Sequence, residues 1–293
     1  MLIAMTLILY IIIPKPNKNL LRLIRKSIIF KSFLVMYLFI DVILVMTISS
    51  DSLSRFFYQG YPPQLFGIIL LIFIVLISKY NIISIINSSY LFFVVVIPLI
   101  LFNFFSHYDL FDISELRLAN KDDVNLKLIV LLLYLTLNNM TYFLFSSYVK
   151  GNIKFIIFIP LLVCVIYQTI ESLALVSLFG DSLIMYDGVG FLTYNIEPSS
   201  TFIGNFDFVY IYTITASAIF KIVISVKLVE ILYKRGKLLK TIFVTLAFIV
   251  VFIATKYISD YSKYIEIAIY VMVFLLITFI LFMWRSKFGK SNK

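Results

Sequence analysis

The sequence is poor in the residues that build metal sites and covalent cross-links. It has one cysteine, Cys164, and one histidine, His107, among 293 residues. A disulfide within the chain is therefore excluded, and a metal site built from His or Cys ligands is not expected. Cys164 lies in an apolar run, where a lone thiol usually behaves as an inert small hydrophobic residue.

Charged residues are also scarce. They make up 14% of the chain, against about a quarter in soluble proteins, while hydrophobic residues make up 62%. The apolar residues come in runs of Ile, Leu, Phe and Val, and no stretch is typical of a soluble domain. Residues 1–293 are therefore expected to form a single polytopic transmembrane domain of the all-α class.

Catalytic motifs are absent as well. The chain has no P-loop, nucleophile elbow, Gly-rich dinucleotide turn or paired catalytic carboxylates, so neither an enzyme nor a cofactor is expected. The formal net charge of +10 would suggest a nucleic-acid partner in a soluble protein. Here the basic residues lie between apolar runs, which is the positive-inside pattern, and the expected partner is the lipid bilayer.

About nine membrane segments are expected, the first of them incomplete, because a full span needs about 20 mostly apolar residues. They are Met1–Ile13, Ile28–Ser49, Leu65–Ser78, Ser89–Phe105, Leu126–Tyr148, Phe155–Phe179, Phe208–Tyr233, Leu238–Ile258 and Tyr264–Trp284. Lys79–Ser88 is interpreted as an amphiphilic connector.

The loops between these segments alternate in charge. The loops at Pro14–Lys26 and near Lys79, Lys150 and Lys234 are basic, as is the tail, whereas the loops over residues 106–125 and 180–206 are acidic. The basic loops are expected in the cytoplasm. This topology places the N-terminus outside and the C-terminus in the cytoplasm.

Lys221 lies near the middle of the Phe208–Tyr233 segment. A charge at that depth costs about 2.5–3.5 kcal/mol on insertion scales, so it needs a partner, a cavity or a function. Asp41 and Glu171 are the counter-charges available in other spans. We expect Asp41 to be the partner, because it and Lys221 both lie near the centres of their helices. The pair has two readings, a structural ion pair within the bundle or part of a ligand or proton pathway.

Other polar residues fall within the spans. Asn138 and Asn139, next to Thr141, either hydrogen-bond between helices or mark an unwound helix that exposes backbone groups to a ligand. Gln168 and Glu171, one turn apart, either line one cavity or lie at a solvated edge. The candidate ligand-binding residues are Asp41, Asn138, Asn139, Thr141, Gln168, Glu171, Thr213, Ser217 and Lys221.

Several short segments occur in a distinctive order: Pro16-x-Lys18-Asn19-Leu20, Tyr61-Pro62, Gly180 with Leu192-Thr193-Tyr194, Phe202-Ile203-Gly204-Asn205-Phe206-Asp207, and Ala218-Ile219-Phe220-Lys221-Ile222. In this order, over nearly the whole chain, they resemble the B-subunit family of spore germinant receptors, within the amino acid–polyamine–organocation transporter superfamily.

The resemblance implies a leucine-transporter-like, ten-helix inverted-repeat fold with its substrate site at midplane. In that frame Ile28–Ser49 corresponds to the third helix, Leu126–Tyr148 to the sixth and Phe208–Tyr233 to the eighth. The first helix has no counterpart, and Met1–Ile13 matches only the end of the second. The implied function is sensing of a small nutrient such as an amino acid in the spore inner membrane, with A-type and C-type receptor subunits as partners. The alternatives are an amino acid or amine transporter on the same fold, or a degenerate structural membrane subunit.

Overall fold

The computed structural model describes residues 24–58, 60–106, 130, 133, 207–233, 236–257 and 262–288. This part of the chain is all-helical and contains no strand. In order, its elements are α3 (Ile28–Ser52), the π-helical turn η1 (Leu53–Phe57), α4 (Pro63–Ile77), α5 (Ile82–Ser106), α9 (Asp207–Leu232), α10 (Gly236–Tyr257) and α11 (Ser262–Phe288).

Within these residues, four helices are long and apolar enough to cross a membrane. The four stretches are Ile28–Arg55, Ile82–Leu99, Leu239–Lys256 and Tyr264–Leu281. Large apolar side chains also face outward: Leu91, Val94 and Phe274 are 68%, 67% and 66% exposed. A soluble protein rarely exposes such apolar surface. The fold is therefore that of a membrane-embedded helical protein, as the composition predicts.

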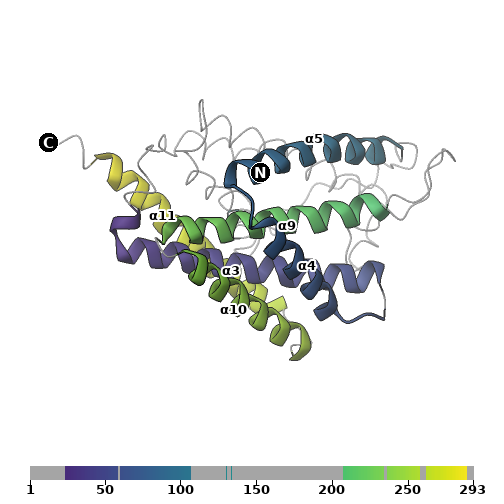
Figure 1. The fold of residues 1–293 in the computed structure, drawn as a ribbon, viewed down its shortest axis with the longest axis horizontal. Coiled ribbons are helices and arrows are strands. Elements are labelled where there is room, and N and C mark those ends of the chain that lie inside the picture. The colour runs from purple at the N-terminus through teal and green to yellow at the C-terminus, as the bar shows by residue number, and fades with distance from the viewer. Residues whose placement is uncertain are drawn as a thin grey trace, which may run out of the picture.

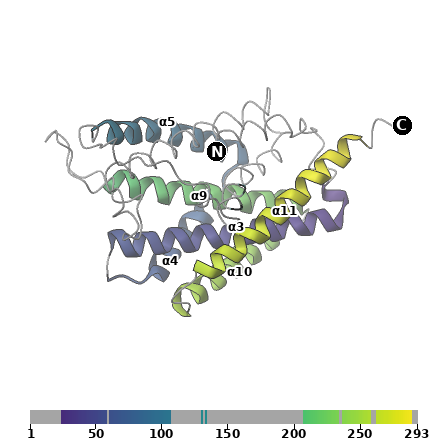
Figure 2. The same ribbon diagram turned by 180° about the vertical axis from the view of Figure 1, so that it is seen from behind.

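Helix α9 lies in the middle of the described bundle. Figures 1 and 2 show it between α5 on one side and α3 on the other, and it also packs against α4 and α10. Helix α11 packs against α3. The bounds of α9 agree with the predicted Phe208–Tyr233 segment, but α9 is not among the four helices above, so its crossing of the membrane stays a prediction.

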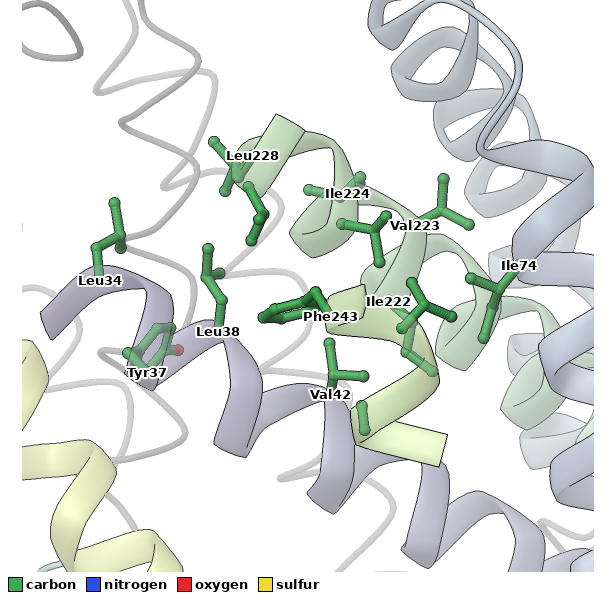
Figure 3. Packing of buried hydrophobic residues seen from close by; sticks show 14 of the residues in the cluster. Leu34, Tyr37, Leu38, Val42, Ile74, Ile222, Val223, Ile224, Leu228 and Phe243 are labelled. Carbon is green, nitrogen blue, oxygen red and sulfur yellow. The ribbon is translucent and has the colours of Figure 1, made fainter. Parts of the chain in front are cut away.

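The contact between α3, α9 and α10 forms part of the apolar core. Leu38 and Val42 of α3 lie beside Ile222 of α9 and Phe243 of α10, and each of these four side chains is at most 6% exposed (Figure 3). Because lipid tails are as apolar as these side chains, close van der Waals contact rather than escape from water stabilises such packing. The interface thus fixes the depth at which polar residues of α3 and α9 meet.

The turn from α3 to α4 is built from residues with special backbone geometry. Gly60 has φ +97°, a value that L side chains rarely adopt. The Ser54 hydroxyl donates a 2.6 Å hydrogen bond to the Tyr61 carbonyl across the turn. Pro63 then occupies the first position of α4, where the missing N–H costs nothing.

The prediction of Lys79–Ser88 as a connector is wrong for most of its length. Only residues 78–81 form the turn, and α5 begins at Ile82. The Asn81 side chain accepts a hydrogen bond from the Ile83 N–H at 3.4 Å, which is the geometry of a helix N-cap. The Ser89 hydroxyl bonds back to the Ile86 carbonyl at 2.7 Å, so this polar residue continues the helix.

The other predicted spans have mixed outcomes. The predicted spans corresponding to α3, α4, α10 and α11 agree with the observed helices to within a few residues. Pro98 lies inside α5, as predicted for a membrane helix. The predicted segments Met1–Ile13 and Phe155–Phe179, and Leu126–Tyr148 apart from positions 130 and 133, lie outside the described residues. The nine-segment count and the inverted repeat therefore stay predictions.

Candidate functional site

Asp41 of α3 and Lys221 of α9 form an ion pair inside the bundle. The Lys221 Nζ atom lies 2.9 Å from Asp41 Oδ1. This contact confirms the pairing that the sequence predicted from the central position of each residue in its helix. The two charges lie next to the apolar core, since Val42 and Ile222, the next residues along each helix, are 2% and 1% exposed.

The two partners differ in their access to solvent or lipid. The Asp41 side chain is 4% exposed, whereas the Lys221 side chain is 30% exposed. Loss of the ammonium would therefore leave a buried carboxylate without a counter-charge, which is the costly way to break such a pair. An anionic group arriving from outside the α3–α9 interface can reach Lys221 without first separating the two helices.

The ion pair is close in distance but poor in direction. Asp41 Oδ1 lies at contact distance from the ammonium, yet it accepts no hydrogen bond from any described residue. Both observations hold if the Lys221 ammonium approaches Asp41 Oδ1 from a direction in which the oxygen has no lone pair. The attraction is then mainly Coulombic, and it depends less on a fixed orientation than a hydrogen-bonded pair does.

Thr213 and Ser217 lie two turns and one turn before Lys221 on α9. Both are half-buried. The Ser217 hydroxyl donates to the Ile214 carbonyl at 3.0 Å, within its own helix. Its lone pairs can still accept a hydrogen bond. The structure therefore places these two candidates on the same helix as Lys221, within reach of one elongated ligand.

Helix α5 contacts α9 beside these residues through the aromatic side chain of Phe92. The Phe92 ring lies 5.3 Å from the Tyr212 ring and 5.7 Å from the Phe220 ring, measured between centroids. Phe220 directly precedes Lys221. Sequence reasoning missed this contact, because scattered aromatic residues in apolar spans give no signal of their partners.

A second polar group on α3 was also missed. Thr47 and Ser50 are 4% and 0% exposed, and their hydroxyl oxygens have no hydrogen-bond partner among the described residues. Ser50 lies beside Gly67 of α4, where an added Cβ would come 3.6 Å from Ser50 Oγ. The run Thr-Ile-Ser-Ser at the end of an apolar span was the available signal.

Beyond these hydroxyls, α3 widens into the π-helical turn η1. The Leu53 N–H is shared between the carbonyls of Ser49 and Ser50. The Tyr58 N–H then bonds to the Leu53 carbonyl at 3.1 Å, five residues back. Such π-turns inside or at the end of α-helices occur frequently at functional sites.

The end of α9 that carries Leu232 meets basic residues from other elements. The Arg25 guanidinium donates from Nε to the Ile231 carbonyl at 2.9 Å and from Nη2 to the same oxygen. Lys31 Nζ lies 4.6 Å above the Tyr233 ring. A cation at a helix C-terminus complements the helix dipole, so these contacts hold the start of the described chain against α9.

Glu230 is the acidic residue at this end. Its carboxylate lies 3.0 Å from Lys227 Nζ and 3.8 Å from Lys240 Nζ. Lys240 also donates to the Ser78 carbonyl at the end of α4, at 3.1 Å. Together with the Arg25 contact, these interactions join the end of α4, the end of α9 and the first turns of α10. The sequence predicted that the loops near Arg25, Lys79 and Lys234 lie on one side of the membrane.

The described charges are distributed unequally between the two ends of the bundle. Basic residues predominate at the end described above, hereafter the basic end, which includes Arg25, Lys26, Lys31, Lys79, Lys227, Lys240 and Glu230. Charges of both signs occur at the opposite end, which includes Asp51, Arg55, Lys256 and Glu266. This asymmetry is what the positive-inside rule leads one to expect of a membrane protein.

Five predicted site residues, Asn138, Asn139, Thr141, Gln168 and Glu171, lie outside the described residues. Within the described part of the chain, no group of three or more His, Cys, Asp or Glu side chains could hold a metal ion. No family model, curated protein or solved structure matches the chain.

Proposed function

We propose that this chain is a membrane-embedded receptor subunit that binds a small nutrient next to Lys221 and responds by changing the packing of α9 against α3. The observation that carries this proposal is the Asp41–Lys221 ion pair, 2.9 Å long and placed near the middle of both helices. Charges within membrane helices are expensive and usually functional. The resemblance to spore germinant receptors points more specifically to a B-type subunit in the spore inner membrane, with A-type and C-type subunits as partners.

The unequal exposure of the pair supports a binding role over a purely structural one. A structural pair is best shielded on both sides, whereas the Lys221 side chain is 30% exposed. A ligand carboxylate that reaches this ammonium would compete with Asp41. The ligand would then favour the arrangement in which Asp41 is released, and a ligand shifts such an equilibrium only by its difference in affinity for the two states. An amino acid has the required carboxylate.

The second candidate function is transport of an amino acid or amine on the same fold. It is favoured by the buried hydroxyls of Thr47 and Ser50, which add polar atoms to α3 beyond the depth of Asp41. Polar groups at several depths of a membrane helix are typical of a substrate pathway. Uptake of the bound compound into proteoliposomes would favour the transporter, and saturable binding without uptake would favour the receptor.

The experiment that tests the proposal is a thermal-stability screen of the purified chain in detergent against amino acids, nucleosides and sugars. A ligand that binds only the folded state raises the melting temperature. The expected result is a shift with one class of compound that Lys221→Met abolishes and Lys79→Met retains. Lys79 is an exposed lysine in the turn between α4 and α5, so it controls for loss of positive charge. A flat response from well-folded protein would favour a degenerate structural subunit.

A further inference from the structure

A small apolar pocket, hereafter the groove, lies between α3 and α11. It is lined by Phe30, Phe33, Leu34 and Tyr37 of α3 and by Leu276 and Phe279 of α11. The hydroxyl of Thr278, which also borders the groove, already donates to the Phe274 carbonyl at 2.9 Å. Its walls are thus aromatic and aliphatic, a composition that suits a hydrocarbon chain better than a polar ligand.

Exposed apolar side chains flank the groove. The flanking side chains Ile29, Met36 and Phe274 are 62%, 48% and 66% exposed, and Phe33 in the groove is 38% exposed. Leu34 and Tyr37, at its floor, are 5% and 2% exposed. The floor is therefore part of the packed core, while the rim faces the surroundings of the bundle.

One end of the groove lies next to the basic end of the bundle. Arg25 and Lys26 are exposed and precede Phe30 by five and four residues. The two bonds from Arg25 to the Ile231 carbonyl use two of its five N–H donors, and the guanidinium makes no other hydrogen bond to a described residue. Arg25 and Lys26 thus directly precede the end of α3 at which the groove begins.

The charges also argue against a second copy of the chain as the occupant. Two copies in one membrane share the same orientation, so a symmetric contact through this groove would bring two basic ends together. Like charges at close range oppose such an interface. An anionic phosphate is the complementary partner, and basic pockets between membrane helices are known to bind anionic headgroups.

We infer that this groove is a binding site for an anionic phospholipid, with an acyl chain along Phe33 and Phe279 and the headgroup phosphate at Arg25 and Lys26. Both parts of the lipid are needed, because the groove supplies apolar contact and the basic end supplies charge. The inference requires only that the chain is embedded in a membrane, and it does not depend on the ligand proposed for Lys221.

The test compares the full chain in nanodiscs of phosphatidylcholine with and without phosphatidylglycerol, by lipid retention in native mass spectrometry and by melting temperature. The wild type is expected to retain phosphatidylglycerol and to melt at a higher temperature when it is present. Lys26→Gln is expected to bind it about fivefold more weakly, the usual effect of one basic residue near an anionic surface. Phe33→Ala is expected to lose retention through the apolar wall alone.

Lys79→Gln is the matched control, because it removes an exposed lysine from the same end of the bundle away from the groove. It is expected to retain the lipid as the wild type does. Equal loss in Lys26→Gln and Lys79→Gln would show unspecific attraction and overturn the inference. Competition by glycerol phosphate, which has no acyl chain, would indicate a site for free phosphate and overturn it too. A dimer that Phe33→Ala separates, with no effect of phosphatidylglycerol, would assign the groove to a second copy.

Discussion

Lys221 Nζ on α9 lies 2.9 Å from Asp41 Oδ1 on α3, and the acidic partner is the more deeply buried of the two. Burying two opposite charges together costs far less free energy than burying one alone. Each residue therefore lowers the cost of burying the other within the bundle. The pair therefore links the packing of the two central helices to any event that changes the charge near Lys221.

The first prediction concerns the stability of this pair. Lys221→Met is expected to lower the free energy of unfolding by about 3 kcal/mol, because it leaves the Asp41 carboxylate buried and unpaired. Asp41→Leu is expected to cost less, since the partly exposed Lys221 side chain can reach polar surroundings. The double variant is expected to be more stable than Lys221→Met. Denaturation in detergent measures all four proteins, and additive effects would show that the two side chains do not interact.

The second prediction concerns Arg25. Arg25→Gln is expected to cost about 1–2 kcal/mol, because the Ile231 carbonyl loses charge-assisted donors at the C-terminus of α9. The loss is local, so hydrogen exchange should become faster in residues 228–233 and stay unchanged in α4. Lys79→Gln, which removes a positive charge but no bond to α9, is the control. Unchanged exchange in Arg25→Gln would contradict a capping role.

Gly60 and Gly67 give predictions of opposite sign. Gly60→Ala is expected to destabilise the fold by about 1–2 kcal/mol, because its φ of +97° strains any residue with a Cβ, although no atom lies within 4 Å. Gly67→Ala is expected to be neutral or to stabilise the fold by up to about 1 kcal/mol. Its Cβ would meet Ser50 Oγ at 3.6 Å, an ordinary contact, and alanine favours a helix over glycine. The measurement is the melting temperature of each variant. A lower melting temperature for Gly67→Ala than for Gly60→Ala would contradict the positive φ at Gly60.

Glu230 provides a prediction on salt dependence. Its carboxylate lies between Lys227 and Lys240 and its side chain is 27% exposed, so the expected cost of Glu230→Gln is about 1 kcal/mol or less. Because salt screens such partly exposed pairs, the difference between the variant and the wild type should shrink as ionic strength rises. A difference that is the same at low and high salt would indicate a packing effect.

Much of the fold could be predicted from hydropathy, because long apolar runs have few alternatives to membrane helices. The prediction failed at the segment Lys79–Ser88, where a mixture of polar and apolar residues was interpreted as a connecting loop. Residues 82–88 belong to α5, and Asn87 and Ser88 are simply exposed on its first turns. Polar residues at a helix end near the membrane surface cost little, so their presence does not tell a loop from a helix.

The central ion pair could be predicted because buried charges are rare in membrane helices, and matching depth selected the partner. Contacts to backbone carbonyls could not be predicted in this way. The hydrogen bond from Arg25 is accepted by the Ile231 carbonyl, and every residue has such a carbonyl. The buried hydroxyls of Thr47 and Ser50 were missed for a similar reason. Serine and threonine are common in apolar spans, and only the packing of α4 on α3 shows which of them are enclosed.

The most direct test of the central claim uses the reversed pair, Asp41→Lys with Lys221→Asp, together with the compound that stabilises the wild type. The reversal keeps one charge of each sign at the same depth, so stability should recover relative to either single change. The cation then sits on α3 instead of on α9. The expected result is a folded protein that no longer responds to the compound. Recovery of stability together with an unchanged response would mean that the pair only holds the bundle together and that the ligand binds elsewhere.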